Sequence, residues 1–139
     1  MKVALIYAST TGNTEAMANA LCDAIKSTGA DVVFDTASNA DKTAVTACDV
    51  ILLGSPAMGA EVLEDSMETF FSGIVGSISS KKVGLFGSYD WGGGQWIRDW
   101  NDRVTNAGAV SAAEPLMVHV TPEDADIEKC KAWAASAVK

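Results

Sequence analysis

The sequence has few of the residues that build metal centres, disulfide frameworks or membrane spans. Its three cysteines, Cys22, Cys48 and Cys130, are far apart and form no C-x-x-C pair. This spacing argues against a metal cluster and favours reduced thiols in or near a core. No apolar run approaches a membrane span and no signal peptide is recognisable, so we expect a cytoplasmic protein without membrane contact. We expect the single histidine, His119, to end a strand rather than to act as a catalyst.

Basic residues are also scarce. The chain has ten Lys and Arg residues and 18 Asp and Glu residues. The resulting net charge of −8 argues against nucleic-acid binding. The acidity has two interpretations that composition cannot separate: it favours docking to basic protein surfaces, or it only keeps the protein in solution. The 139 residues are 48% hydrophobic and show no linker or internal repeat, so we predict one domain spanning residues 1–139 with a full core.

What the chain does have is an alternation of strand and helix patterns. Strands are predicted at residues 2–8, 31–35, 49–54, 82–87 and 109–120, the last interrupted near Pro115. Helices are predicted at residues 15–28, 63–75, 95–107 and 123–138, and residues 37–48 form a loop with at least one helical turn. This alternation predicts an α/β fold, a three-layer α-β-α sandwich around a five-stranded parallel sheet in the order 2-1-3-4-5.

A hydroxyl-rich turn follows the first predicted strand. Its residues are Ser9, Thr10, Thr11, Gly12, Asn13 and Thr14, and a helical pattern follows them directly. The unpaired amides and the positive dipole end of a helix favour a phosphate there, and the hydroxyls add neutral donors. The alternative is that Asn13 or Thr14 only caps a surface helix, and this segment alone leaves both interpretations open.

In the predicted sheet, two further loops converge on this turn. They are residues 55–61, after the third strand, and 88–94, after the fourth. Trp91 stands between Asp90 and three glycines, where little can cover its indole, so a planar partner can stack on it. Met58 can contact the opposite face of that partner through its polarizable sulfur. A phosphate at one end and a planar ring at the other describe a mononucleotide. The other tryptophans lie on helical faces that we expect to be buried or half buried: Trp96, Trp100 and Trp133.

Residues 5–14 resemble the FMN-phosphate signature of flavodoxins, and residues 56–61 and 86–92 resemble the flavin-contacting loops of short-chain, clostridial-type flavodoxins. The resemblance runs from end to end of the chain. It implies that Met58 and Trp91 lie against the two faces of the flavin and that Glu61 accepts a hydrogen bond from it. The cofactor-binding residues that it implies are Ser9, Thr10, Thr11, Gly12, Asn13, Thr14, Pro56, Ala57, Met58, Gly59, Ala60, Glu61, Ser88, Tyr89, Asp90, Trp91 and Gly92.

The resemblance also implies a function. Such a protein is a low-potential one-electron carrier with non-covalently bound FMN and no metal, passing between quinone, semiquinone and hydroquinone states. It turns over no substrate of its own. We expect a monomer that serves redox proteins with basic docking surfaces, such as reductases and oxidoreductases. One departure is Asp90, which stands where the family commonly has glycine, so a positive φ at this position would strain the backbone.

Other functions of similar folds fit less well. An FMN-dependent NAD(P)H:quinone-type reductase needs room for a hydride donor over the flavin, and a Trp91 that covers the ring argues against it. A phospho-receiver domain needs acidic residues after the first strand and an Asp at the end of the third, where this chain has Ser9-Thr10 and Gly54. A dinucleotide-binding domain would carry G-x-G-x-x-G, which is missing here. A purely structural domain would leave Trp91 among its glycines unexplained.

Overall fold

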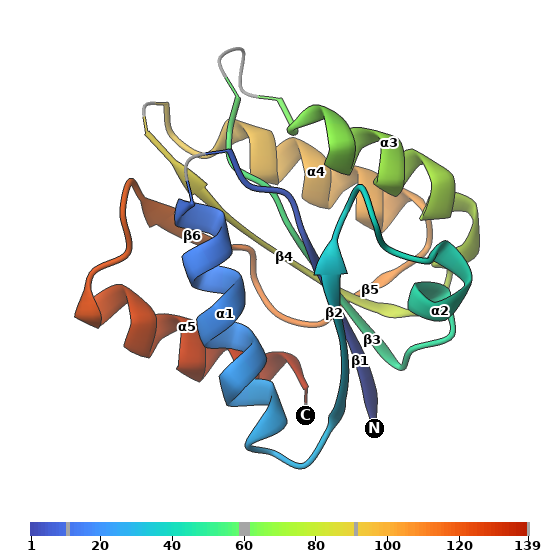
Figure 1. The fold of residues 1–139 in the computed structure, drawn as a ribbon. Helices are drawn as coiled ribbons and strands as arrows, with labels where there is room; N and C mark the ends of the chain where they lie inside the picture. Colours follow the sequence, from blue (N-terminus) through green and yellow to red (C-terminus); the bar gives the residue numbers. More distant parts are fainter. Residues whose placement is uncertain (11, 59–61, 91, 139) are drawn as a thin grey trace.

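The computed structural model describes residues 1–10, 12–58, 62–90 and 92–138, which form a parallel sheet with helices on both faces (Figure 1). The strands are β1 (Lys2–Tyr7), β2 (Asp31–Thr36), β3 (Val50–Gly54), β4 (Lys82–Tyr89), β5 (Val110–Ser111) and β6 (Leu116–His119). The helices are α1 (Asn13–Lys26), α2 (Lys42–Thr46), α3 (Asp65–Ile74), α4 (Gln95–Asn106) and α5 (Asp124–Ala137), and the 3-10 helix η1 (Val75–Ser77) follows α3.

The predicted strand order is confirmed. The sheet runs β2-β1-β3-β4-β5, and every described strand pair is parallel. The predicted last strand is divided, because β5 and β6 each pair with β4 and Pro115 lies between them. Proline has no N–H to donate to a strand ladder, which agrees with a break at this point. Among the described residues the sheet therefore has six strands in place of the five that we expected.

Side chains of the central strands alternate between two cores. On β1, Val3 and Leu5 pack toward α1 and α5, whereas Ala4 and Ile6 pack toward α3 and α4. Figure 1 shows the same division, with α1 and α5 on one face of the sheet and α3 and α4 on the other. A strand that is covered on both faces must be apolar throughout, and β3 is buried along its whole length. The core between the sheet and helices α3 and α4 contains Trp96 and Trp100, each 1% exposed. Trp133 is partly buried and packs on the other core, beneath α1 and α5. Both placements agree with the prediction.

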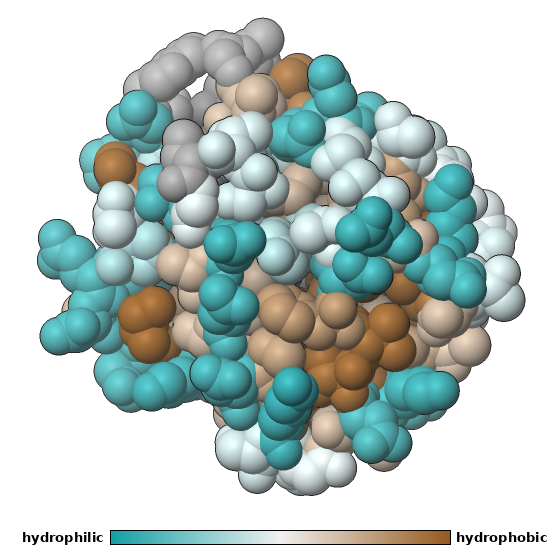
Figure 2. Space-filling view, in the orientation of Figure 1, coloured by the Kyte–Doolittle hydropathy of each residue, from teal (hydrophilic) through white to brown (hydrophobic). Residues whose placement is uncertain are grey.

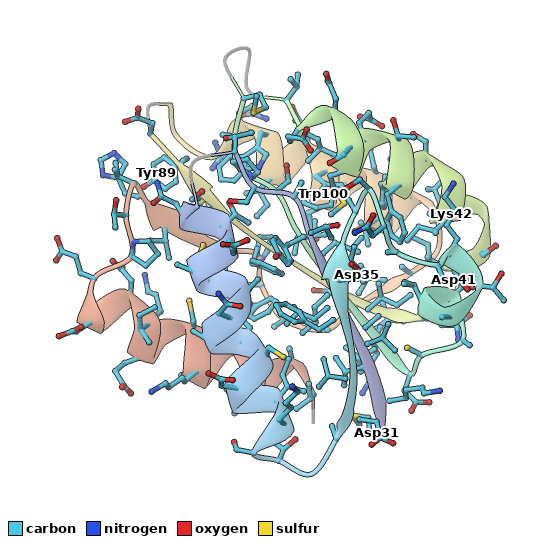
Figure 3. The ribbon with its side chains drawn as sticks, viewed as in Figure 1. Asp31, Asp35, Asp41, Lys42, Tyr89 and Trp100 are labelled. Carbon is cyan, nitrogen blue, oxygen red and sulfur yellow. The ribbon has the colours of Figure 1, made fainter. Side chains whose placement is uncertain are left out.

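The ends of two helices depend on acidic side chains. Asp41 caps α2 by accepting hydrogen bonds from the amides of Thr43 and Ala44, at 2.9 and 3.3 Å, at the position that Figure 3 labels. Glu64 caps α3 by accepting from the Ser66 amide at 3.0 Å, so this helix starts two residues later than the hydrophobic pattern indicated. Such caps satisfy amides that helix geometry leaves without partners.

All three cysteines are free and buried, as the sequence indicated. Burial raises the pKa of the Cys22 and Cys48 thiols, and raises the pKa of Cys130 to about 11. The thiolate is the reactive form, so these side chains are unreactive parts of the core at neutral pH. Of the helices that the structure describes, none has the length and hydrophobicity needed to cross a bilayer.

Candidate functional site

The loops after β1, β3 and β4 meet at the carboxyl edge of the sheet. Hydrogen bonds continue the ladder beyond the strands: the Ala8 amide donates to the Gly54 carbonyl at 2.9 Å, and the Ser55 amide to the Phe86 carbonyl at 3.1 Å. The Ala57 amide then donates to the Ser88 carbonyl, also at 2.9 Å. Figure 1 shows these loops at the upper left, above α1 and beside the start of α4. The convergence that was predicted from the strand order is therefore present.

In the first loop, a serine hydroxyl that precedes the turn accepts hydrogen bonds from two amides at the start of α1. The Ser9 hydroxyl accepts from the amides of Gly12 at 3.2 Å and Glu15 at 3.3 Å. The N-cap of α1 is Gly12, with φ 92° and no capping side chain, so neither Asn13 nor Thr14 is the cap. Helix geometry gives the amides of Asn13 and Thr14 no acceptor within the helix. No described residue accepts a hydrogen bond from either amide, and helix N-termini favour an anion at this position.

Thr14 ties the first loop to the third. Its side chain is 1% exposed, and its Oγ1 lies 2.7 Å from Oγ of Ser88, which is 4% exposed. Only one of the two hydroxyl hydrogens is used in this contact, so the other can donate to a further acceptor. A buried donor of this kind beside the first amides of α1 fits a bound phosphate.

The second loop is fixed by Ser55, a residue that the sequence analysis did not single out. Ser55 is fully buried, donates to the Pro56 carbonyl and accepts from the Glu64 amide, both at 3.0 Å. Trp96 Nε1 donates to the Ser55 carbonyl at 3.3 Å. The half-buried Met58 closes the near end of the loop, its amide donating to the Val62 carbonyl at 2.9 Å. A serine between a fully apolar strand and a proline is the only sequence signal for this role.

Strand β4, which leads into the third loop, approaches the second loop very closely at Gly87. A Cβ added to Gly87 would lie 2.1 Å from the Ser55 carbonyl oxygen, so only glycine allows this approach. The half-buried Tyr89 follows, its ring centroid 5.0 Å from that of His119 and 6.0 Å from that of Trp96 (Figure 3). Asp90 is exposed, and it does not carry a positive φ; the described non-glycine residues that do are Ser80 and Val120. The strain that we considered for Asp90 is therefore not present.

Two side chains from outside the third loop also hold it, and the sequence analysis predicted neither contact. His119 ends β6, as predicted, and its Nε2 lies 2.7 Å from the Asp90 carbonyl oxygen. Arg98 in α4 reaches back so that Nη1 donates to the Gly93 carbonyl at 2.7 Å. Both contacts depend on how α4 and β6 pack, which local sequence does not encode.

The structure places the described residues of the predicted site in these three loops or at their edges: Ser9, Thr10, Gly12, Asn13, Thr14, Pro56, Ala57, Met58, Ser88, Tyr89, Asp90 and Gly92. The other predicted residues, Thr11, Gly59, Ala60, Glu61 and Trp91, lie outside the described residues. Within the described ranges, no group of His, Cys, Asp and Glu side chains could hold a metal ion.

A carboxylate lies close to the first loop. Glu15 Oε2 accepts a hydrogen bond from the Tyr7 hydroxyl at 3.1 Å. Burial, followed by Glu15 itself, raises the pKa of the Tyr7 phenol, so this hydroxyl stays protonated and keeps donating. The loop therefore combines neutral donors with a fixed negative neighbour, and an anion held there depends on short hydrogen bonds rather than on a basic side chain.

Comparison with known proteins gives one consistent result. The family model described as Flavodoxin matches residues 5–133. A flavodoxin of Megasphaera elsdenii is 44% identical over 138 residues, covering 99% of this chain and 98% of its own. A flavodoxin of Clostridium beijerinckii is 42% identical over 123 residues, 88% of this chain and 89% of its own. The solution structure of two-electron reduced Megasphaera elsdenii flavodoxin superposes with a TM-score of 0.87 at 43% identity, covering 99% of this chain and 98% of that one.

Proposed function

Because the chain belongs to the flavodoxin family, it is an FMN-binding electron carrier rather than an enzyme, and we propose that its three converging loops hold the cofactor. Bound FMN supplies the electron chemistry, while the protein binds it, orients it and sets its electrostatic surroundings. The observation that carries the assignment of residues is the position of the Asn13 and Thr14 amides, which have no acceptor among the described residues, beside the buried Thr14–Ser88 hydroxyl contact.

The first loop takes the phosphate in this proposal. The amides and hydroxyls of residues 9–14 supply donors, and no Lys or Arg occurs in that segment. Neutral donors leave the phosphate charge uncompensated, so a reduced, more negative cofactor is disfavoured next to it. The site thereby contributes to a low reduction potential, which suits a carrier that delivers electrons.

The second and third loops take the ring. Met58 and Tyr89 are each half buried, so both offer apolar surface at the rim of the sheet. We assign Pro56, Ala57, Gly59, Ala60, Ser88, Asp90 and Gly92 to the ring edge, Trp91 to the face opposite Met58, and Glu61 to a hydrogen bond from the ring. These assignments rest on the resemblance to short-chain flavodoxins and on the position of the loops.

FMN binding to the phosphate loop is tested by titrating the FMN-free protein with FMN and with riboflavin, which lacks the phosphate, and by following flavin fluorescence. We expect one FMN to bind and riboflavin to bind far more weakly. Thr14→Val should weaken FMN about ten- to a hundredfold, the range for a hydrogen bond to a charged group, and should affect riboflavin little.

Thr105→Val is the matched control, because the Thr105 hydroxyl only donates to the Asn101 carbonyl on the exposed face of α4. It should leave FMN affinity unchanged. Equal affinity for FMN and riboflavin would contradict the assignment of the first loop to the phosphate. A wild-type protein that takes up neither flavin would contradict the proposed cofactor site.

The partners and the setting of this carrier also belong to the proposal. We propose a single-domain monomer that works in the cytoplasm. Its net charge of −8 favours docking to redox proteins with basic surfaces. The reductase alternative is not favoured, since the relatives in which this chain covers most of both sequences are flavodoxins. Steady-state oxidation of NAD(P)H by the purified FMN-loaded protein should accordingly be negligible.

A further inference from the structure

Strand β2 forms one lateral edge of the sheet, and part of its backbone points away from the sheet. Among the described residues, β2 pairs with β1 alone. The amides of Asp31 and Ala37 both donate to carbonyls of residues 1–7, so the odd-numbered residues face β1. Backbone groups in a strand alternate in direction. The residues whose amides and carbonyls face outward are therefore Val32, Phe34 and Thr36.

The last of these three residues already has partners within the chain. Asp35 Oδ1 accepts a hydrogen bond from the Thr36 amide at 2.8 Å. The Thr36 carbonyl accepts from two amides of the turn that follows, at 2.9 and 3.1 Å. No described residue is a backbone partner for the outward groups of Val32 and Phe34. We call residues 32–34 the open edge, and it offers two amides and two carbonyls.

The open edge has apolar side chains on both faces of the strand. Val32 and Val33 are half buried against the two cores, and Phe34 is 37% exposed. The Phe34 ring stacks on Tyr7 with 5.5 Å between the ring centroids, so it is supported although it faces solvent. Figure 2 shows hydrophobic residues gathered near β2 and α2. An extended segment along the open edge would cover apolar surface as well as form hydrogen bonds.

Two aspartates flank the open edge. Asp31 and Asp35 lie two residues before and two residues after Val33 and share its face of the strand, and Figure 3 labels both along β2. Neither carboxylate forms an ion pair with a described residue. A segment that binds the open edge would therefore meet one negative charge at each end.

The same aspartates disfavour a second copy of this chain as the occupant. In an antiparallel pairing of two β2 strands, Val32 of each copy would exchange hydrogen bonds with Phe34 of the other. This register centres on Val33 and places Asp31 of each copy directly opposite Asp35 of the other. Like charges in opposed positions destabilise a sheet, and charged residues on an edge strand protect it against self-pairing.

We propose that the open edge binds an extended segment of a partner protein, with Lys or Arg opposite Asp31 and Asp35 and apolar residues between them. The segment gains four backbone hydrogen bonds, from Val32 and Phe34, and one ion pair at each end. The open edge runs along the side of the sheet, whereas the three loops lie at its carboxyl edge (Figure 1). Docking here therefore leaves the proposed cofactor site uncovered.

The test uses isotope-labelled, FMN-loaded protein and the end-blocked peptide Lys-Val-Thr-Val-Lys, observed by NMR. Antiparallel pairing of this peptide puts one lysine opposite each aspartate and its two valines opposite Val32 and Phe34. We expect the amide signals of residues 31–36 to shift on titration. Hydrogen exchange at the Val32 and Phe34 amides should slow when the peptide is bound.

Two further peptides separate the hydrogen bonds from the charges. Lys-Pro-Thr-Val-Lys keeps both positive charges but lacks one amide that faces the open edge, and Glu-Val-Thr-Val-Glu reverses the charges. Each should bind at least about threefold more weakly than the first peptide. Equal binding of the proline peptide would overturn the proposal, as would signal shifts that spread over the acidic surface without a focus at residues 31–36.

Asp31→Asn combined with Asp35→Asn removes both charges, and the amide oxygen of the second change can still accept from Thr36. The dissociation constant of the lysine peptide should rise about three- to tenfold, as expected for two exposed ion pairs. Asp102→Asn combined with Glu128→Gln is the matched control, because it changes the net charge equally at exposed positions of α4 and α5. It should leave the dissociation constant within about twofold of wild type. Equal effects of the two double variants would contradict the role of the β2 aspartates.

Sedimentation without peptide tests the other occupant. Wild-type protein should remain monomeric, and a dimer with slow exchange at Val32 and Phe34 would overturn the proposal by assigning the open edge to a second copy. FMN affinity should be the same with and without saturating peptide. A protein that binds the peptide at β2 but takes up no flavin would contradict the proposed function and leave this inference in place.

Discussion

At the scale of single residues, Val120 offers a direct test of backbone strain. Its φ of 58° costs an L-residue with a branched Cβ about 1–2 kcal/mol, whereas asparagine enters this region readily. Val120→Asn keeps the amide that donates to Tyr89 and loses a side chain that is already 39% exposed. We expect the free energy of unfolding to rise by about 1 kcal/mol, as measured by urea denaturation.

Val110→Asn is the control for this change. Val110 is 51% exposed and lies in β5 without a positive φ. The same substitution there removes a residue with high strand propensity and relieves no strain, so stability should stay level or fall slightly. An equal gain at both positions would mean that the backbone at Val120 is not the cause.

Gly87 is predicted to be the least tolerant glycine at the site. An alanine there would bring Cβ within 2.1 Å of the Ser55 carbonyl oxygen, a backbone atom that cannot move without shifting the second loop. We expect Gly87→Ala to lower the free energy of unfolding by about 1–3 kcal/mol and to weaken FMN binding. In Gly76→Ala, where nothing lies within 4 Å, urea denaturation should give a value within about 0.5 kcal/mol of wild type.

At the scale of elements, a bidentate salt bridge joins α3 to α4. Arg103 donates from Nη1 and Nη2 to the two carboxylate oxygens of Glu68, at 2.8 and 2.7 Å, and its guanidinium lies 4.8 Å from the centre of the Phe71 ring. The hydrogen bond from Arg103 lowers the pKa of Glu68. The pair therefore stabilises the fold above the usual Glu pKa, and that contribution disappears as pH falls through the lowered value.

A double-mutant cycle with Glu68→Gln and Arg103→Gln should give a coupling energy of about 0.5–1 kcal/mol at pH 7, since both side chains are more than two-fifths exposed, and a smaller one at pH 3. The Lys131–Glu128 pair, with 3.5 Å between Nζ and Oε1 and one side chain 75% exposed, is the comparison. Its coupling should be close to zero at both pH values. Equal coupling in the two pairs would contradict the role given to geometry.

The elements were predictable from sequence because their hydrophobic patterns reflect which faces are covered. The continuous apolar run of β3 identified a central strand, and Pro115 identified the break in the last one. The extent of α2 was less predictable, since five residues carry little periodicity and the helix depends on the Asp41 cap.

For the candidate site, the sequence indicated which loops converge but not which side chains hold them in place. Ser9, Arg98 and His119 act through side-chain directions that only tertiary packing determines.

At the scale of the whole molecule, charge should govern encounters with partners. Figure 2 shows hydrophilic residues over much of one face, with hydrophobic residues gathered near β2 and α2. With a net charge of −8, electron transfer from the reduced protein to a basic acceptor such as cytochrome c should slow at least about tenfold between 0.01 and 0.5 M salt, because salt shortens the range of attraction. Stopped-flow mixing measures this rate. A neutral small-molecule oxidant should show almost no salt dependence, and a flat profile with the protein acceptor would exclude electrostatic docking.

The hydroxyl contact between Thr14 and Ser88 has a consequence for how the protein is made. It joins residues 74 positions apart, so the first loop cannot make this contact until Ser88 in β4 has been synthesised. A ribosome-bound chain that ends before Ser88 holds the whole signature motif and still lacks its buried partner. We therefore expect the protein to take up FMN only after most of the polypeptide has emerged, and we expect a truncated product not to bind it.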